Sequence, residues 1–280
     1  MKVCLIMPNV FPVPATKGGA TEMLITNLLE ENEKEGKINF TCVSVYEEEA
    51  KKISRNYKYT NFIYINQKRD NSDLTFEKKD NCFIQYMDEI YEKIKNEQFD
   101  FIIIEGGDIT GYEYILKRFP QEKCIVHIHG DMIGNNKINN KIYGKFLAIS
   151  KYTKKLIMKD GIIPKEKIEL LYNAIKLENF EKKLSKEEKD KLRKKYEIEK
   201  DDTVILFSGR TIPQKGVKQL IQSFKKLKNI EKCKLLIVGS SNYGEKVKTE
   251  FDYELEKISA DIKDKIRFTG YIKNEELYKI

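Results

Sequence analysis

Short apolar runs of strand length alternate with amphipathic segments along most of the chain, and this alternation restricts the fold more than any other feature. Seven apolar runs lie within the first 175 residues, and several of the segments between them carry apolar side chains at helical spacing. The predicted strands are 2–7, 38–46, 61–65, 99–104, 124–129, 146–149 and 168–172. Strands that alternate with helices predict an α/β fold with a parallel sheet covered on both faces.

Helical spacing is clearest in three segments between these strands. Residues 21–33 place Leu24, Leu28 and Leu29 on one face, and residues 83–94 carry a second apolar stripe. A third helix is predicted at 151–159, with Ser150 as its N-cap and Gly161 ending it.

A second series of strands and helices begins near residue 201. Its predicted strands are 204–207, 235–238 and 266–269, and a charged segment precedes it, in which Ser185 and Glu188 form a capping-box pattern. We therefore expect a Rossmann-like domain at 1–173, a charged linker and helix at 174–200, and a second domain at 201–280. Because this domain has only three predicted strands where the sequence stops, we expect it to be incomplete.

Composition narrows the class of protein. The longest apolar runs are too short to cross a bilayer, and the N-terminus lacks the apolar core of a signal peptide. The five cysteines are scattered without a Cys-x-x-Cys pair, which predicts buried free thiols and a cytoplasmic protein. The net charge of +8 fits an anionic partner, but a general richness in lysine explains it equally well.

Glycines and cations lie where predicted strands end, which is where open α/β sheets bind ligands. Gly18 and Gly19 follow the first strand and precede a helix, whose N-terminus attracts phosphate. Arg210 and Lys215, each beside a glycine, follow the strand 204–207. Both cations suit phosphate oxygens, although two solvated loop cations are the alternative interpretation.

The only two histidines of the chain are in the motif "VHIHGDM". His127 and His129 lie two residues apart on one face of a predicted strand, and Asp131 follows them. A metal site is one interpretation, but the chain has no further histidine to complete it. A packed strand residue is the alternative for His127, whereas His129 lies at the strand tip. Another glycine-rich strand end, Glu105–Gly107, indicates a tight turn or an acceptor contact.

Several motifs in this order resemble the family-four retaining glycosyltransferases of the GT-B fold. They are "KGGATE", "HIHG", "AISKYTKKLI", "LLYNAI", "FSGRTIPQKGVKQLIQSF", "LLIVGS" and "IRFTGYIKNEEL". The resemblance covers the whole chain and implies two Rossmann-like domains. It implies transfer of a sugar from a nucleotide-sugar to an acceptor in polysaccharide or cell-envelope biosynthesis. It also implies that no metal or other cofactor is required.

The resemblance assigns roles to individual residues. Arg210 and Lys215 would hold the donor diphosphate, and Gly18 and Gly19 would approach the same phosphates. His129 would line the sugar pocket as the catalytic residue. The donor-binding set is completed by residues that would pack on the nucleobase, namely Gly270, Tyr271 and Ile272.

The resemblance also sets expectations about activity and partners. The glutamate pair that contacts the donor in this family has no counterpart before residue 280, so residues 1–280 alone are expected not to turn over a nucleotide-sugar. The alternative is a non-catalytic or truncated interaction protein with residual nucleotide binding. The expected partners are a nucleotide-sugar and a glycan or lipid-linked acceptor, with no nucleic acid. Lys151, Lys154, Lys155 and Lys159 fit a peripheral contact with anionic lipid at the inner face of the membrane.

Overall fold

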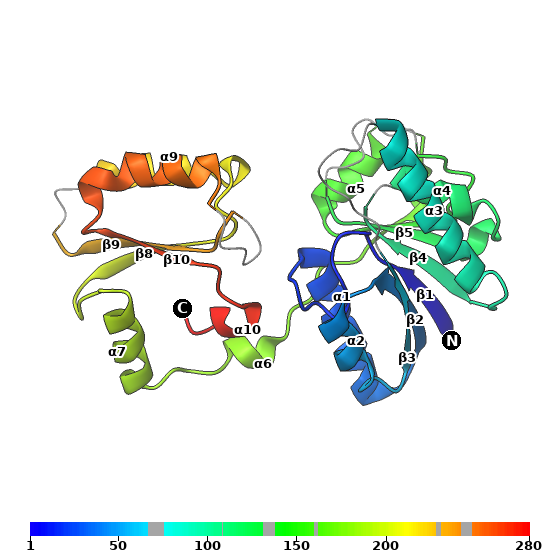
Figure 1. Ribbon diagram of the computed structural model, residues 1–280, viewed down its shortest axis with the longest axis horizontal. Helices are drawn as coiled ribbons and strands as arrows, with labels where there is room; N and C mark the ends of the chain where they lie inside the picture. The colour runs from blue at the N-terminus through cyan, green and yellow to red at the C-terminus, as the bar shows by residue number, and fades with distance from the viewer. Residues whose placement is uncertain (67–75, 108, 131–137, 160–161, 228–230, 242–247) are drawn as a thin grey trace. The chain divides into compact units, whose positions relative to one another are not determined.

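The computed structural model describes residues 1–66, 76–107, 109–130, 138–159, 162–227, 231–241 and 248–280. The chain forms two compact units, Met1–Ile175 and Lys176–Ile280, called unit 1 and unit 2 below (Figure 1). Each unit is built on a sheet in which all the strands are parallel. The predicted α/β class with two parallel sheets is therefore confirmed.

Unit 1 contains a seven-stranded sheet in the order β3-β2-β1-β4-β5-β6-β7. Its strands are β1 (Lys2–Ile6), β2 (Asn39–Val45), β3 (Thr60–Ile65), β4 (Phe101–Glu105), β5 (Cys124–Ile128), β6 (Lys145–Ala148) and β7 (Ile168–Leu170). Its α-helices are α1 (Ala20–Glu35), α2 (Glu48–Ser54), α3 (Phe76–Ile94), α4 (Ile109–Leu116) and α5 (Lys151–Met158).

The two faces of this sheet carry separate apolar cores. Along β1, Val3 and Leu5 join α1 in one cluster, whereas Cys4 and Ile6 join α3 and α4 in the other. Alternate side chains of a strand point to opposite faces, so a continuous apolar strand is buried on both sides. Helix α1 ends at Gly36, which adopts φ 65°, a conformation that suits glycine at a helix end.

Unit 2 contains a three-stranded sheet in the order β10-β9-β8. Helices α8 and α9 pack on one face of the sheet, through Leu235 and Ile237 of β9, whereas Leu236 and Val238 point to the other face. Figure 1 shows α9 and α7 on opposite sides of this sheet. The elements are α6 (Leu177–Phe180), α7 (Lys186–Lys195), β8 (Thr203–Ser208), α8 (Val217–Lys225), β9 (Cys233–Val238), α9 (Glu250–Ser259), β10 (Ile266–Gly270) and α10 (Asn274–Leu277).

All ten predicted strands are present, with ends that differ by at most two residues. The strand predicted at 124–129 ends at Ile128, so His129 lies just beyond it. Both predicted helix caps are confirmed: Ser150 Oγ accepts from Thr153 N at 3.0 Å, and Ser185 and Glu188 form a capping box. Gly161, predicted to end α5, lies outside the described residues, and α2 and α4 were not predicted.

Two further sequence predictions concern cysteines and membrane spans. Cys4, Cys42, Cys124 and Cys233 are buried and free of disulfides, as predicted, whereas the side chain of Cys82 is outside the described residues. Among the helices of the described ranges, none combines the length and apolar character needed to cross a membrane.

Candidate functional site

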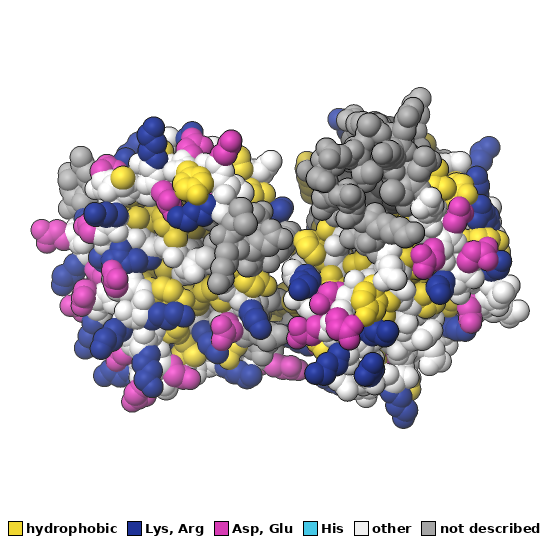
Figure 2. Space-filling view, in the orientation of Figure 1, with side chains coloured by type: hydrophobic (Ala, Val, Ile, Leu, Met, Phe, Trp, Pro, Cys, Tyr) yellow, Lys and Arg dark blue, Asp and Glu magenta, His cyan; other side chains and the backbone are white. Residues whose placement is uncertain are grey.

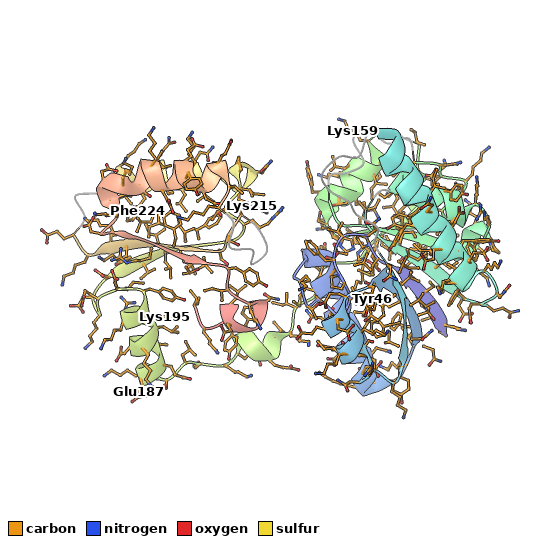
Figure 3. The ribbon with its side chains drawn as sticks, viewed as in Figure 1. Tyr46, Lys159, Glu187, Lys195, Lys215 and Phe224 are labelled. Atoms are coloured by element: carbon orange, nitrogen blue, oxygen red, sulfur yellow. The ribbon has the colours of Figure 1, made fainter. Side chains whose placement is uncertain are left out.

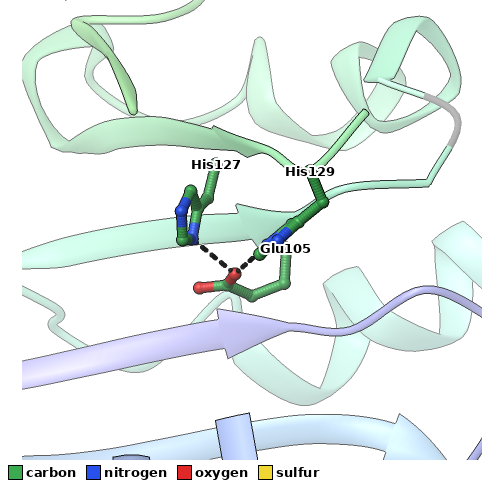
Figure 4. A group of neighbouring side chains, drawn as sticks. All are labelled: Glu105, His127 and His129. Carbon is green, nitrogen blue, oxygen red and sulfur yellow. Dashed lines mark hydrogen bonds and ion pairs between the residues drawn. The ribbon is translucent and has the colours of Figure 1, made fainter. Parts of the chain in front are cut away.

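The carboxyl ends of β4 and β5 in unit 1 bring one carboxylate and both histidines of the chain together (Figure 4). Glu105 ends β4 and pairs in register with His127 of the neighbouring strand β5. Its Oε2 lies 2.9 Å from His127 Nδ1 and 3.0 Å from His129 Nε2. Glu105 is 2% exposed, so a single buried carboxylate oxygen contacts two imidazole rings.

The charge of this cluster follows from the pKa of Glu105. Burial raises that pKa, but the hydrogen bonds from His127 and His129 outweigh the burial, and the pKa lies below its usual value. Glu105 is therefore ionised at neutral pH and acts only as an acceptor. A buried carboxylate is costly unless it is paired, and the two histidines supply the pairing.

The same three residues also form a set that could hold a metal. Glu105, His127 and His129 each supply one ligand atom, and these atoms lie within 4.8 Å of one another. Two imidazoles and a carboxylate suit zinc, but a ligating histidine usually donates its second ring nitrogen to an acceptor. In the described part of the chain, His127 Nε2 and His129 Nδ1 are buried without partners. The arrangement therefore fits a hydrogen-bonded carboxylate better than a metal centre, and Asp131 lies outside the described residues.

The predicted glycine pair lies at the start of α1 in unit 1. Gly18 and Gly19 have φ 86° and 91°, and a Cβ on Gly19 would lie 2.1 Å from Glu22 Oε2. Glu22, in the first turn of α1, is buried, and this burial raises its pKa. An ionised Glu22 would repel a phosphate at this helix end, whereas a protonated one would not. Glu22 was not predicted as a site residue, and the phosphate contact of Gly18 and Gly19 stays a prediction.

In unit 2, a glycine lies at the carboxyl end of every strand of the sheet. Gly209 and Gly239 follow β8 and β9, and Gly270 ends β10. Gly239 N donates to Gly270 O at 3.0 Å, and Gly209 N donates to Val238 O at 2.9 Å. A Cβ on Gly239, where φ is 128°, would lie 2.0 Å from Gly209 O. The three strand ends therefore pack backbone against backbone. This edge of the sheet, formed by Gly209, Gly239 and Gly270, is called the glycine edge below.

The two predicted cations belong to the loop that leaves this edge. Arg210 and Lys215 are exposed, and Gly216, with φ 73°, precedes the first residue of α8. Within the described part of the chain, Lys215 has no carboxylate partner among the ion pairs. Figure 3 shows Lys215 at the opposite end of the α8 segment from Phe224, which packs in the core. Arg210 directly follows Gly209 at this edge, and Lys215 lies later in the same loop. Their contact with a diphosphate stays a prediction.

The carboxylate of Asp252 connects this loop to the start of α9 through hydrogen bonds. Asp252, in the first turn of α9, accepts from Thr249 N at 2.8 Å and from Thr249 Oγ1 at 2.7 Å. It also accepts from Ser241 Oγ at 2.5 Å and, through its other oxygen, from Thr211 Oγ1 at 3.1 Å. Thr211 is buried and directly follows Arg210. Asp252 therefore connects the loops after β8 and β9 to the start of α9, a role that was not predicted.

The residues predicted to contact a nucleobase separate into two environments. Tyr271 is 44% exposed just after β10. Ile272 packs against the apolar cluster of Ile198, Leu236 and Val238. Tyr271 is therefore exposed beside Gly270, whereas Ile272 is partly buried.

A family model supplies the observation that decides what this unit is. Residues 188–280, which include the glycine edge and the loop with Arg210 and Lys215, match the family "Glycosyl transferases group 1". This segment is a glycosyl transferases group 1 domain. The group 1 domain accounts for most of unit 2 and includes Arg210, Lys215 and Gly270–Ile272.

Two curated relatives of the chain are glycosyltransferases by name. One is an uncharacterized glycosyltransferase of Methanocaldococcus jannaschii, 29% identical over 134 residues, which are 48% of this chain and 33% of that protein. Another is the lipopolysaccharide 1,2-N-acetylglucosaminetransferase of Salmonella typhimurium, 27% identical over 161 residues, 56% of this chain and 40% of that protein. The matched segments thus span less than half of either relative.

Solved structures resemble the chain over nearly its whole length. A glycosyltransferase from Rickettsia africae has a TM-score of 0.73 at 19% identity, covering 99% of this chain and 70% of that one. The Anabaena protein HepE in complex with UDP-glucose has a TM-score of 0.64 at 13% identity, covering 97% of this chain and 69% of that one. The chain therefore has the GT-B fold, with the group 1 domain in the smaller of its two units.

Proposed function

We propose that this protein is a retaining glycosyltransferase of the hexosyltransferase type. It would transfer a sugar from a nucleotide-sugar to a polysaccharide or glycolipid acceptor. The observation that carries the proposal is the glycine edge of the group 1 domain, with Arg210 and Lys215 in the loop that leaves it. Cations in a loop at a strand end suit the oxygens of a diphosphate, and glycines there let a ligand approach the backbone closely.

Arg210 and Lys215 would bind the donor diphosphate and stabilise its charge as the glycosidic bond breaks. Such stabilisation of a leaving group is usually the largest single contribution to catalysis. The distribution of charge supports this assignment. Unit 2 contains 26 of the 52 Lys and Arg residues but only 19 of the 44 Asp and Glu residues. Most of the excess positive charge therefore belongs to the unit that would hold the anion.

The remaining contacts would divide between the donor's phosphates, sugar and base. His129 would line the sugar pocket, Gly18 and Gly19 would approach the phosphates, and Tyr271 with Gly270 would pack on the base. Ile272 would act indirectly, because its side chain supports this segment from the apolar cluster. The cationic pair can neutralise the diphosphate without a metal ion, so no cofactor is required.

The acceptor is proposed to be glycan or lipid-linked, with α5 as a contact to anionic membrane at the cytoplasmic face. Lys151, Lys155 and Lys159 are exposed, together with Tyr152. Lys154, which the sequence placed with them, instead donates to the backbone oxygen of Ile168 in β7 at 2.9 Å. The proposed membrane surface therefore contains three of the four lysines. On the face shown in Figure 2, positive and negative side chains are interspersed.

The proposal is tested by following nucleotide release from a panel of UDP- and GDP-sugars, with and without glycan acceptors. We expect release by a parent protein that also contains the donor-contacting glutamate pair implied by the resemblance. Arg210→Ala, Lys215→Ala should lower this release at least about 10-fold, since removing a charged hydrogen-bond partner costs about 1.5–3 kcal/mol. The variant Lys194→Ala, Lys195→Ala removes the same charge from exposed positions on α7 and serves as the control. Absence of release by the parent, or equal rates in both variants, would contradict the proposal.

A further inference from the structure

The Glu105 cluster, formed by Glu105, His127 and His129, is asymmetric, and this asymmetry bears on which ring nitrogen of each histidine carries a proton. His127 faces the carboxylate with Nδ1, whereas His129 faces it with Nε2 (Figure 4). The two rings are close, with centroids 4.1 Å apart. One carboxylate oxygen therefore contacts chemically different nitrogens of two neighbouring rings.

The protons in this cluster can be assigned from the hydrogen bonds. An ionised carboxylate only accepts, so His127 Nδ1 and His129 Nε2 each carry a proton. The opposite nitrogens, His127 Nε2 and His129 Nδ1, are buried and have no acceptor in the described part of the chain. A proton on either would be a buried donor without a partner, which is unfavourable. Both opposite nitrogens therefore keep a lone pair.

We propose that Glu105 is a positioning residue that fixes His127 as the Nδ1–H tautomer and His129 as the Nε2–H tautomer. His129 then keeps Nδ1 as an unprotonated acceptor in a fixed orientation. This inference rests on the proposed function, in which His129 lines the sugar pocket. In that setting Glu105 acts through His129 and does not itself touch the donor.

The cluster is suited to positioning because its parts are rigid. Glu105 and His127 belong to adjacent strands that are paired in register, and His129 follows directly. Gly106, with φ 75°, brings the chain against the His129 ring, where a Cβ would lie 3.4 Å from Cδ2. Small displacements of a catalytic group reduce rates strongly, by about 100-fold for a shift of 1 Å.

The test uses the fact that the chain has only two histidines. In ¹⁵N-histidine-labelled protein, long-range ¹H–¹⁵N spectra contain four ring nitrogens, and each shift reports whether its nitrogen is protonated. We expect protonated His127 Nδ1 and His129 Nε2, with the other two nitrogens unprotonated. In Glu105→Gln these shifts should move toward tautomer-averaged values. Nucleotide release should fall about 10- to 100-fold in kcat, with a smaller change in KM.

Glu33→Gln is the matched control, because Glu33 is also a carboxylate with several hydrogen bonds, to Lys58 N, Tyr59 N and Thr60 Oγ1. It should change neither the histidine shifts nor kcat. Averaged shifts in the parent, or an unchanged kcat in Glu105→Gln, would overturn the inference. So would stoichiometric Zn²⁺ binding that shifts His127 Nδ1 and His129 Nε2. A parent without nucleotide release would overturn the proposed function and with it the positioning role, while the spectra would still decide the tautomers.

Discussion

Replacement of Asp252 by alanine tests how the loop that carries Arg210 is held. The substitution removes one half of the Thr249–Asp252 capping box and leaves the hydroxyls of Ser241 and Thr211 without their acceptor. Loss of a cap costs about 1 kcal/mol. Each lost bond to a carboxylate adds about 0.5–1.5 kcal/mol, because Asp252 is partly exposed and the usual value must be reduced. We therefore expect unit 2 to lose about 2–4 kcal/mol of unfolding free energy.

The effect of Asp252 should depend on pH with a definite sign. Burial raises the pKa of Asp252, but the hydrogen bonds from Ser241, Thr249 and Thr211 outweigh it and lower the pKa in the folded state. A lowered folded pKa contributes stability above the ordinary pKa of about 3.9, and that stability is lost as the pH falls through the folded pKa. The difference between parent and variant should be constant from about pH 5 to 8 and should shrink below about pH 4.

The measurement combines urea unfolding, followed by circular dichroism because the chain has no tryptophan, with hydrogen exchange of residues 209–216 and 249–259. Faster exchange is expected in both segments, since Thr211 joins them. Glu256→Ala is the control on the same helix, where an exposed pair with Lys248 should contribute about 0–1 kcal/mol. Faster exchange in 249–259 alone, or a loss no greater than the control's, would refute the role of Asp252 in holding the loop.

Two other perturbations test separate parts of the account. Gly239→Ala should destabilise unit 2 by more than about 2 kcal/mol in urea unfolding, because its Cβ would overlap Gly209 O at a positive φ. Gly130→Ala, whose Cβ would have no described atom within 4 Å, should be near neutral, and similar losses would contradict the packing. Changing Lys151, Lys155 and Lys159 to Glu should weaken binding to anionic vesicles, measured by co-sedimentation, by about 1 kcal/mol per lysine. Lys154→Glu should chiefly lower stability. Unchanged co-sedimentation of the triple variant would contradict the proposed membrane surface.

Much of the fold could be predicted because strands buried on both faces appear in the sequence as short, continuous apolar runs. β1 is almost entirely apolar and is followed within three residues by Pro8 and Asn9, so its existence and approximate end follow from pattern alone. Helix α4 was missed because "ITGYEYIL" is only eight residues long, contains a glycine and shows no clear helical stripe. The strand order could not be predicted, because local periodicity does not say which parallel strands are neighbours.

The site residues also fall into two groups: those that a local sequence pattern indicates, and those whose contacts join residues far apart in the sequence. Arg210 and His129 stood out as candidates because each lies near a recognisable strand end, and Lys215 because it lies in the loop after β8. The link from Glu105 to both histidines requires knowing that β4 and β5 are adjacent, and these residues are 22 and 24 positions apart. The bond from Asp252 to Thr211 spans 41 positions and leaves no local pattern.

The central claim is that the loop of Arg210 and Lys215 binds the diphosphate of a nucleotide-sugar. Calorimetric titration of uridine, UMP and UDP, and of the guanosine series, into the parent and the Arg210→Ala, Lys215→Ala variant tests it most directly. The account predicts that affinity in one of the two series rises with each phosphate in the parent, and that this rise is largely lost in the variant while nucleoside affinity is kept. An equal rise in both proteins, or no rise in the parent, would contradict it.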